Sequence, residues 1–307
     1  MFEIIPKTNI NFTGRRKLAF GLSGLFILLG LAAFVAIMIG RANMGLDFSG
    51  GTMIQGNFEK PVTVAAVREA LTATGHGDAE IQELVGHIKP NSYSIRVKGT
   101  VTELGEVDSL LLSALASAFP DNAFHLDSSH EVGPAIGKLL RKQASMAVLY
   151  SMIGILIYIW VRFDFRVGVT ATIGTFHDVL AVLGIVFLLN KEITLLIVTA
   201  LLTVAGYSLS DKVVVFDRVR ENLKLYRKKG EFETLLNTSI NEVLSRTFIT
   251  STGVLITLVV LYIFGSSVIR DFALAMFLGV LVGTYSSIFL SSGIMLEWEN
   301  RSPKRFK

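Results

Sequence analysis

Long apolar stretches separated by short polar segments dominate the chain, and one long polar segment interrupts them in its first half. Six stretches have the roughly 17–25 mainly apolar residues that a helix needs to cross a bilayer. They cover Leu18–Gly40, Gln143–Val161, Val167–Asn190, Ile193–Phe216, Thr247–Phe264 and Asp271–Leu296. The pattern therefore predicts a membrane α-helical protein with six transmembrane helices.

The long polar segment, residues 41–142, carries the periodicity of a small folded domain. Alternation of apolar and polar residues predicts strands in "GTMIQGNF", "AEIQELVG", "SYSIRVKG" and "AFHLDSSHEVG". Helical spacing predicts helices in "TVAAVREALTATG" and "VTELGEVDSLLLSALASAF". The resulting order βαββαβ is that of a ferredoxin-like α+β sandwich.

Positive charge gathers on one side of the predicted spans. Lys and Arg crowd the segments before the first span, after the second, between the fourth and fifth, and after the sixth, whereas the short opposite loops hold only Lys191 and Arg270. The positive-inside rule then places both termini in the cytoplasm. The predicted layout is a cytoplasmic segment 1–17, a span 18–40, an extracytoplasmic domain 41–142, five spans in 143–296 with a cytoplasmic loop 217–246, and a tail 297–307. The first apolar core is longer than that of a signal peptide, so we interpret it as an uncleaved anchor.

Composition supports a membrane protein and narrows its chemistry. Of the 307 residues, 51% are hydrophobic and 18% are charged, against about 25% charged in soluble domains. The absence of Cys excludes disulfides, thiol catalysis and Cys-based metal sites. The modest net charge of +4 does not indicate nucleic-acid binding. The glycines of Gly45–Gly51 lack the Gly-Lys-Ser/Thr of a phosphate loop and predict a flexible turn. We expect no cofactor, no metal and no enzymatic activity.

Asp211 and Lys212 lie inside the apolar run of the fourth predicted span. Lys212 is expected to extend its ammonium to the cytoplasmic headgroups. The short Asp211 side chain cannot do so, and a carboxylate inside the membrane costs about 2.5–3.5 kcal/mol. It shares its helix face with Tyr207 and Ser208, which offer hydroxyl partners. Asp211 is therefore either a structural hydrogen-bonding residue or a carboxyl that gains and loses a proton.

Two further groups of residues are candidates. An amphipathic helix over 232–247, lying on the inner membrane face, brings Arg246 to the mouth of the fifth span as a counter-charge for Asp211, unless Arg246 is only a positive-inside anchor. His177 and Asp178 lie near the middle of the third span, deeper than Asp211, and either relay protons or bond to a neighbouring helix. Gly279 and Gly283 allow close helix contact in the last span.

Five motifs occur in an order and spacing that resemble the SecF family of bacterial protein translocase subunits, within the resistance-nodulation-division superfamily. They are "GLDFSGGT", "EVGPAIG", "FHDVLAVLG", "GYSLSDKVVVFDRVREN" and "LSRTFITS", and they span nearly the whole chain. The family's intramembrane Asp matches Asp211, and the Arg that opens its fifth span matches Arg246. Where the family usually carries a small hydroxyl residue after the Asp, this chain has Lys212.

The resemblance implies partners and an energy source. Proteins of this family pair with SecD, associate with the SecYEG channel and use the proton gradient to help move preproteins across the bacterial inner membrane. YajC is a further candidate partner, membrane lipid surrounds the spans, and no nucleic acid is involved. Two other functions stay open: a structural scaffold subunit of a translocase, or half of a proton-driven exporter of small molecules or lipids.

Overall fold

The computed structural model describes residues 8–84, 89–98, 106–224 and 232–303. The chain divides into a helical unit, Met1–Asn43 with Ala147–Lys307, and an α+β unit, Met44–Met146. Several of the basic residues used to predict the orientation lie outside the described residues, namely Lys7, Arg227, Lys228, Lys229, Lys304, Arg305 and Lys307.

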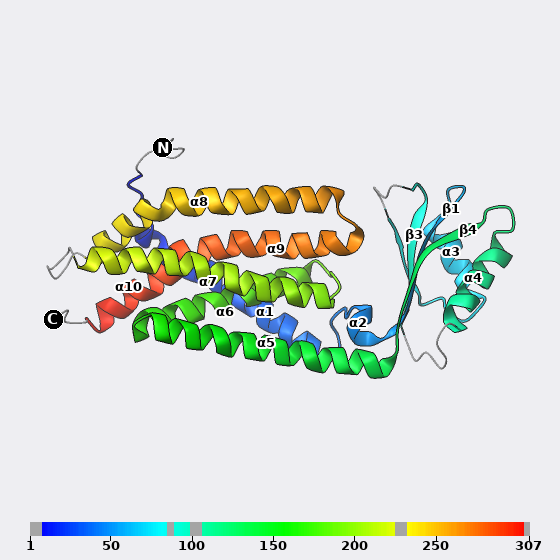
Figure 1. Cartoon of the computed structure of the whole chain (residues 1–307), viewed down its shortest axis with the longest axis horizontal. Helices are drawn as coiled ribbons and strands as arrows, with labels where there is room; N and C mark the ends of the chain where they lie inside the picture. Colours follow the sequence, from blue (N-terminus) through cyan, green and yellow to red (C-terminus); the bar gives the residue numbers. More distant parts are fainter. Residues whose placement is uncertain (1–7, 85–88, 99–105, 225–231, 304–307) are drawn as a thin grey trace. The chain divides into compact units, whose positions relative to one another are not determined.

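Among the described residues, six helical segments are long and apolar enough to cross a membrane, which confirms the predicted number of spans. Five are single helices: α1 (Arg16–Met38, after the short turn η1, Thr13–Arg15), α5 (Pro134–Arg162), α6 (Phe165–Leu188), α7 (Leu195–Leu223) and α8 (Phe232–Phe264). The sixth is composite and consists of α9 (Ser267–Tyr285), η2 (Ser286–Ser291) and α10 (Ser292–Arg301) (Figure 1).

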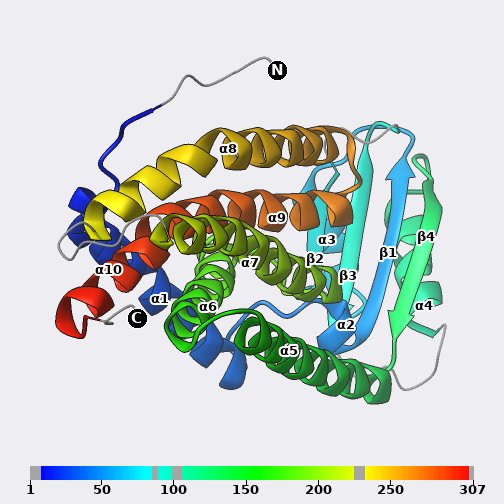
Figure 2. The same ribbon diagram turned by 60° about the vertical axis from the view of Figure 1, so that its left-hand side comes forward.

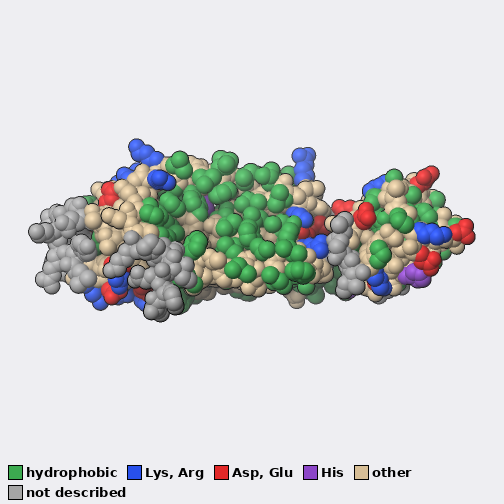
Figure 3. Space-filling model, turned by 90° about the horizontal axis from the view of Figure 1, so that it is seen from above, with side chains coloured by type: hydrophobic (Ala, Val, Ile, Leu, Met, Phe, Trp, Pro, Cys, Tyr) green, Lys and Arg blue, Asp and Glu red, His purple; other side chains and the backbone are tan. Residues whose placement is uncertain are grey.

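The helical unit has an inner and an outer set of helices. The apolar windows of α6, α7 and the composite sixth span are half or more buried, whereas those of α1, α5 and α8 are only 17–22% buried. Large apolar side chains are exposed on the outer helices, for example Leu149 and Ile157 on α5 and Ile256 and Val260 on α8. Figure 3 shows hydrophobic side chains spread over the face of this unit that it presents. An apolar exterior of this kind suits contact with lipid.

Two helices differ from the predicted ones. The α7 helix continues to Leu223, about two turns beyond the predicted end of its span. The α8 helix is continuous from Phe232 to Phe264, so the prediction of a separate amphipathic helix before the fifth span is wrong. At 1.5 Å per residue its 33 residues extend about 50 Å, which exceeds the ~30 Å hydrocarbon core.

The last span contains a π-helical segment, η2, which the hydrophobic pattern did not predict. Its wider turn ends with Ser291, and Ser286, Ser287 and Ser291 are all buried. Single-turn π segments inside α-helices are frequent at functional sites.

Glycines let α1 and α6 approach each other closely. A Cβ atom added to Gly30 would lie 2.4 Å from the backbone oxygen of Leu180, and one added to Gly184 would lie 2.7 Å from the nitrogen of Gly30. Neither backbone atom can rotate away, so this contact depends on the two missing side chains.

The α+β unit confirms the predicted βαββαβ order. Its elements are α2 (Leu46–Ser49), β1 (Gly51–Phe58), α3 (Val64–Thr72), β2 (Glu80–Glu83), β3 (Ser92–Lys98), α4 (Glu106–Ala118) and β4 (Phe124–Val132). The sheet is antiparallel with strand order β2-β3-β1-β4, the arrangement of a ferredoxin-like sandwich (Figure 2). In place of the flexible turn predicted at Gly45–Gly51, one helical turn precedes two glycines with positive φ, Gly50 and Gly51.

The core of this unit lies between the sheet and helices α3 and α4. Its buried members include Ile54, Phe58, Val67, Leu71 and Ile95. Phe58 also makes an edge contact with Tyr93. The Tyr93 hydroxyl donates to the carbonyl of Val62, and burial raises the pKa of this phenol. A domain of this size can build one apolar core, and the buried Tyr93 hydroxyl has the hydrogen-bond partner that it needs there.

Two asparagines of α8 hold the segment that precedes α1. The Oδ1 atom of Asn241 accepts from the backbone nitrogen of Ile10 at 3.0 Å and from the hydroxyl of Thr8 at 2.7 Å. Its Nδ2 atom donates to the carbonyl of Ile10 at 2.9 Å. One turn earlier, Asn237 Oδ1 accepts from the nitrogens of Phe12 and Thr13. The two asparagine side chains therefore hold the segment mainly through hydrogen bonds to its backbone.

We expect Asn241→Ala to loosen this segment without altering the spans. It removes three hydrogen bonds at a partly exposed site, a loss of about 1–2 kcal/mol. Amide hydrogen exchange measured on residues 8–13 should become faster, while exchange in α6 and α7 stays unchanged. Equal protection of residues 8–13 in both proteins would contradict this account.

Candidate functional site

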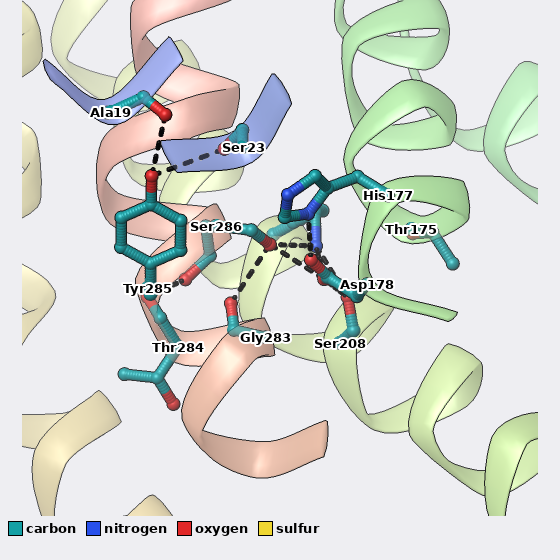
Figure 4. A network of polar contacts seen from close by, with 12 residues as sticks. Ala19, Ser23, Thr175, His177, Asp178, Ser208, Gly283, Thr284, Tyr285 and Ser286 are labelled. Carbon is teal, nitrogen blue, oxygen red and sulfur yellow. Dashed lines mark hydrogen bonds and ion pairs between the residues drawn. The ribbon is translucent and has the colours of Figure 1, made fainter. Parts of the chain in front are cut away.

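A buried ion pair joins α6 to α7. The Lys212 Nζ atom lies 2.6 Å from Oδ2 of Asp178, and neither side chain is exposed (0% each). Figure 4 shows the network around this pair, in which side chains from α6, α7 and the composite last span converge. Charges buried this deeply are tolerated when they are paired and their remaining hydrogen-bonding capacity is satisfied.

Every hydrogen of the Lys212 ammonium has an acceptor. Besides Asp178, the ammonium donates to the hydroxyls of Ser208 and Ser286, the latter at 2.9 Å. Both hydroxyls also donate a hydrogen bond to Oδ2 of Asp178, and the one from Ser286 is 2.7 Å long. The four side chains therefore form a closed polar cluster in which the charges compensate each other.

His177 bonds to the other carboxylate oxygen. Its Nδ1 atom lies 2.8 Å from Oδ1 of Asp178 and carries the proton, because the carboxylate is the acceptor. Its Nε2 atom is buried and has no hydrogen-bond partner among the described residues. The ring is in edge contact with Phe26 of α1.

Two glycines leave the space that the cluster occupies. A Cβ atom at Gly174, one turn before Asp178, would lie 2.3 Å from Cε of Lys212. A Cβ atom at Gly283 would lie 3.3 Å from that of Ser208. Ser208 and Lys212 are four residues apart and share one face of α7. Close packing of α6, α7 and the last span thus brings the cluster together.

The prediction that Lys212 reaches the cytoplasmic headgroups is wrong. Its side chain is fully buried and points to Asp178, and α7 continues for three more turns toward Leu223. The contact does not contradict the predicted difference in depth between Asp178 and Asp211, because the lysine stem passes Gly174 before its ammonium reaches Asp178. The carboxylate of Asp178 pairs with the ammonium inside the helical unit, so the ammonium does not have to reach the headgroups.

Asp211 lies outside this cluster. It is 7% exposed, and its Oδ2 atom has no hydrogen-bond partner among the described residues. Its carboxyl lies near the hydroxyl of Thr284 on α9. Thr284 Oγ1 lies 3.0 Å from Ser251 Oγ of α8, which accepts a 3.1 Å hydrogen bond from the hydroxyl of Tyr207. These hydroxyls form a file from Tyr207 to Thr284, beside Asp211, which we call the hydroxyl file.

The structure does not pair Arg246 with Asp211. Arg246 is exposed on α8, and no ion pair between the two occurs in the part of the chain that the structure describes. Gly279 and Gly283 both face α7, where a Cβ atom at Gly279 would lie 2.1 Å from the side chain of Val204. Among the described residues, no group of three His, Asp or Glu side chains could hold a metal ion.

A family comparison decides what kind of protein carries this site. Residues 113–301 match the family described as "Protein export membrane protein SecD/SecF, C-terminal". The chain belongs to the SecD/SecF family. It is 48% identical to the protein translocase subunit SecF of Thermodesulfovibrio yellowstonii, over 96% of this chain and 97% of that one. It is 41% identical to SecF of Calditerrivibrio nitroreducens, over 94% of this chain and 93% of that one.

A solved structure shows the same fold. The crystal structure of SecDF from Thermus thermophilus, titled a translocon-associated membrane protein, superimposes with a TM-score of 0.82 at 36% identity over 98% of this chain. SecDF in a super-membrane-facing form matches with a TM-score of 0.68. This chain spans 40% of that longer SecDF chain. The chain is thus a multi-pass membrane protein of the SecF type.

Proposed function

We propose that this chain works with a SecD partner to couple the proton gradient to preprotein export through the SecYEG channel, in the bacterial inner membrane with both termini cytoplasmic. The observation that carries the coupling role is Asp211, a buried carboxyl in a membrane span, one oxygen of which has no hydrogen-bond partner among the described residues. Family membership supports the translocase role, as does the description of Thermus SecDF as translocon-associated.

The two buried carboxyls differ in what they are free to do. Asp178 is committed to the ammonium of Lys212 and to two serine hydroxyls. Asp211 has no such cation, and it contacts a file of hydroxyl groups, each of which can both donate and accept a hydrogen bond. A carboxyl that exchanges a proton needs an accessible partner rather than a fixed counter-ion, so Asp211 fits this role and Asp178 fits a structural one.

The hydroxyl file supplies a route for the proton. Tyr207 is only half-buried, and it lies one turn from Asp211 toward the N-terminal end of α7, on the predicted extracytoplasmic side. Protons pass along hydrogen-bonded hydroxyls when each group can donate to the next. Ser251 joins Tyr207 to Thr284 and is therefore the link without which the file is broken.

Work on a preprotein requires an energy source, and a transmembrane gradient can supply it. One charge that crosses about 100 mV provides about 2.3 kcal/mol, so several protons could drive a substantial movement of a domain. Arg246, exposed at the cytoplasmic half of α8, would pair with Asp211 only in a different arrangement of these helices.

Complementation tests the proposed function. Cells depleted of their own SecF are supplied with this chain and the SecD from the same source, and export is followed with the gradient intact or collapsed by an uncoupler. We expect restored, uncoupler-sensitive export and co-purification of SecD and SecYEG in mild detergent. Assembly with normal export that ignores the uncoupler would support a scaffold role and contradict the coupling role.

We expect Ser251→Ala to slow the gradient-dependent step about 30-fold, because the file loses two hydrogen bonds of about 1 kcal/mol each. Thr257→Ala is the matched control, since that hydroxyl on the same helix is exposed and bonds only to the backbone of Gly253. Initial rates of export with an imposed gradient measure both. Equal rates for the two variants would exclude the file as the route.

A further inference from the structure

The Lys212 ammonium occupies a pocket whose walls are oxygen atoms. Its partners are Oδ2 of Asp178 and the hydroxyls of Ser208 and Ser286, contributed by α6, α7 and η2 (Figure 4). A negatively charged oxygen together with hydroxyl oxygens is a ligand set that small hard cations prefer. The ammonium therefore stands where a metal cation of single charge could be bound.

A further oxygen of the pocket is not used by the ammonium. The Ser291 side chain is fully buried, and its Oγ atom has no hydrogen-bond partner among the described residues. A Cβ atom at Gly174 would lie 2.5 Å from this oxygen and 2.3 Å from Cε of Lys212, so both flank the same point. A buried hydroxyl without a partner costs about 1–3 kcal/mol, and a cation in place of the lysine stem would satisfy it.

The local backbone has the form that membrane cation sites use. Ser286 and Ser291 begin and end the π-helical segment η2, where the regular α-helical hydrogen bonding is interrupted. Irregular helical segments near the middle of a span supply cation ligands in membrane transporters. The pocket thus combines charge, convergent oxygens and an interrupted helix.

We propose that Asp178, Ser208, Ser286 and Ser291 form a site for a monovalent cation such as sodium, and that Lys212 fills it with its own ammonium. The wild-type chain then carries a tethered cation, and free sodium is excluded from the pocket. This inference concerns occupancy of the pocket alone and does not depend on the proposed proton coupling through Asp211.

Thermal unfolding of the purified full chain tests this inference. Lys212→Ala is compared with the wild type in about 0.1 M sodium chloride and in N-methylglucamine chloride of the same ionic strength. We expect sodium to raise the Tm of Lys212→Ala by about 5 °C or more, because an ion that binds only the folded state stabilises it. The wild-type Tm should be the same in both salts.

Further variants locate the bound ion. In the Lys212→Ala background, Asp178→Asn should abolish the sodium effect, and Ser291→Ala should move its midpoint to a higher sodium concentration. Ser287→Ala is the control, because that buried hydroxyl already bonds to the carbonyl of Thr284. A sodium effect that survives Asp178→Asn would overturn the assignment, as would a Lys212→Ala protein with equal Tm in both salts.

A Lys212→Ala protein that does not fold also tests the proposed cation site. The proposal requires sodium to replace the missing positive charge, so folded Lys212→Ala that is recovered only in sodium supports it. Lys212→Thr, which keeps a small polar side chain, should behave in the same way. If neither variant folds in either salt, the ammonium has a role that sodium cannot take, and the proposal is wrong.

Discussion

Asp211→Asn is expected to abolish the gradient-dependent part of preprotein export while the subunit still assembles. The substitution keeps the size of the side chain and its contact with Thr284, but an amide cannot exchange a proton at any relevant pH. Export into inverted vesicles is measured with the gradient intact and after an uncoupler is added. The ratio of the two rates should fall to about one, since proton transfer through this carboxyl is the coupling step that we propose.

Asp217→Asn is the matched control for this prediction. It makes the same change on the same helix, at an exposed residue that pairs with Arg162 at 2.9 Å. Exposed ion pairs contribute only about 0–1 kcal/mol, so export should keep its dependence on the gradient. Coupling that persists in Asp211→Asn would remove Asp211 from the mechanism, and equal losses in both variants would indicate a general defect of α7.

Lys212→Met is expected to lower the free energy of unfolding by about 3–5 kcal/mol, because it leaves the carboxylate of Asp178 buried without its cation. The double variant Asp178→Asn with Lys212→Met should recover most of this loss, since no unpaired charge remains. Thermal unfolding of the full chain in detergent measures both.

A surface pair provides the control for the buried one. Lys191 lies 2.8 Å from Asp271, and both side chains are about one-third exposed. Lys191→Met should therefore cost no more than about 1 kcal/mol. A double variant as unstable as Lys212→Met would show that packing around the lysine stem, and not the ion pair, holds α6 and α7 together.

The fold was largely predictable because its signals are local. The six spans follow from apolar runs of sufficient length, and strand β1 follows from the alternation in Gly51–Phe58. The ends of α7 and α8 were not predictable in the same way. Both helices continue beyond the apolar run of their span into polar sequence, where hydropathy no longer marks a boundary.

The candidate site was predicted as a set of residues but not as an arrangement. Asp178, Lys212 and Ser208 were all recognised as candidates, yet nothing in the periodicity tells which helices of a bundle face each other. The pairing of Asp178 with Lys212 depends on close packing at Gly174 and Gly283, which is a tertiary property. The length of the lysine side chain alone predicts that its ammonium reaches the headgroups. The packing of α6 against α7 instead places the carboxylate of Asp178 beside the ammonium.

Some residues of the site were missed although the sequence carried a signal. Ser286, Ser287 and Ser291 are polar residues in an apolar span, and their clustering in "SSIFLSS" could have indicated an interior polar surface. Ser251 and Thr284 were missed because single hydroxyl residues are common in spans and usually bond to their own helix. Only the structure shows that Tyr207, Ser251 and Thr284 are joined by hydrogen bonds beside Asp211.

In the proposed mechanism the two buried carboxyls have different roles: Asp178 is held in an ion pair, and Asp211 exchanges a proton. Infrared difference spectroscopy on the full chain with isotopically labelled Asp tests this directly, because a protonated carboxyl absorbs apart from a carboxylate. The account predicts a carboxylic band that appears on acidification, is absent in Asp211→Asn, and is retained in the double variant Asp178→Asn with Lys212→Met. A band that is unchanged in Asp211→Asn, or lost in the double variant, would contradict it.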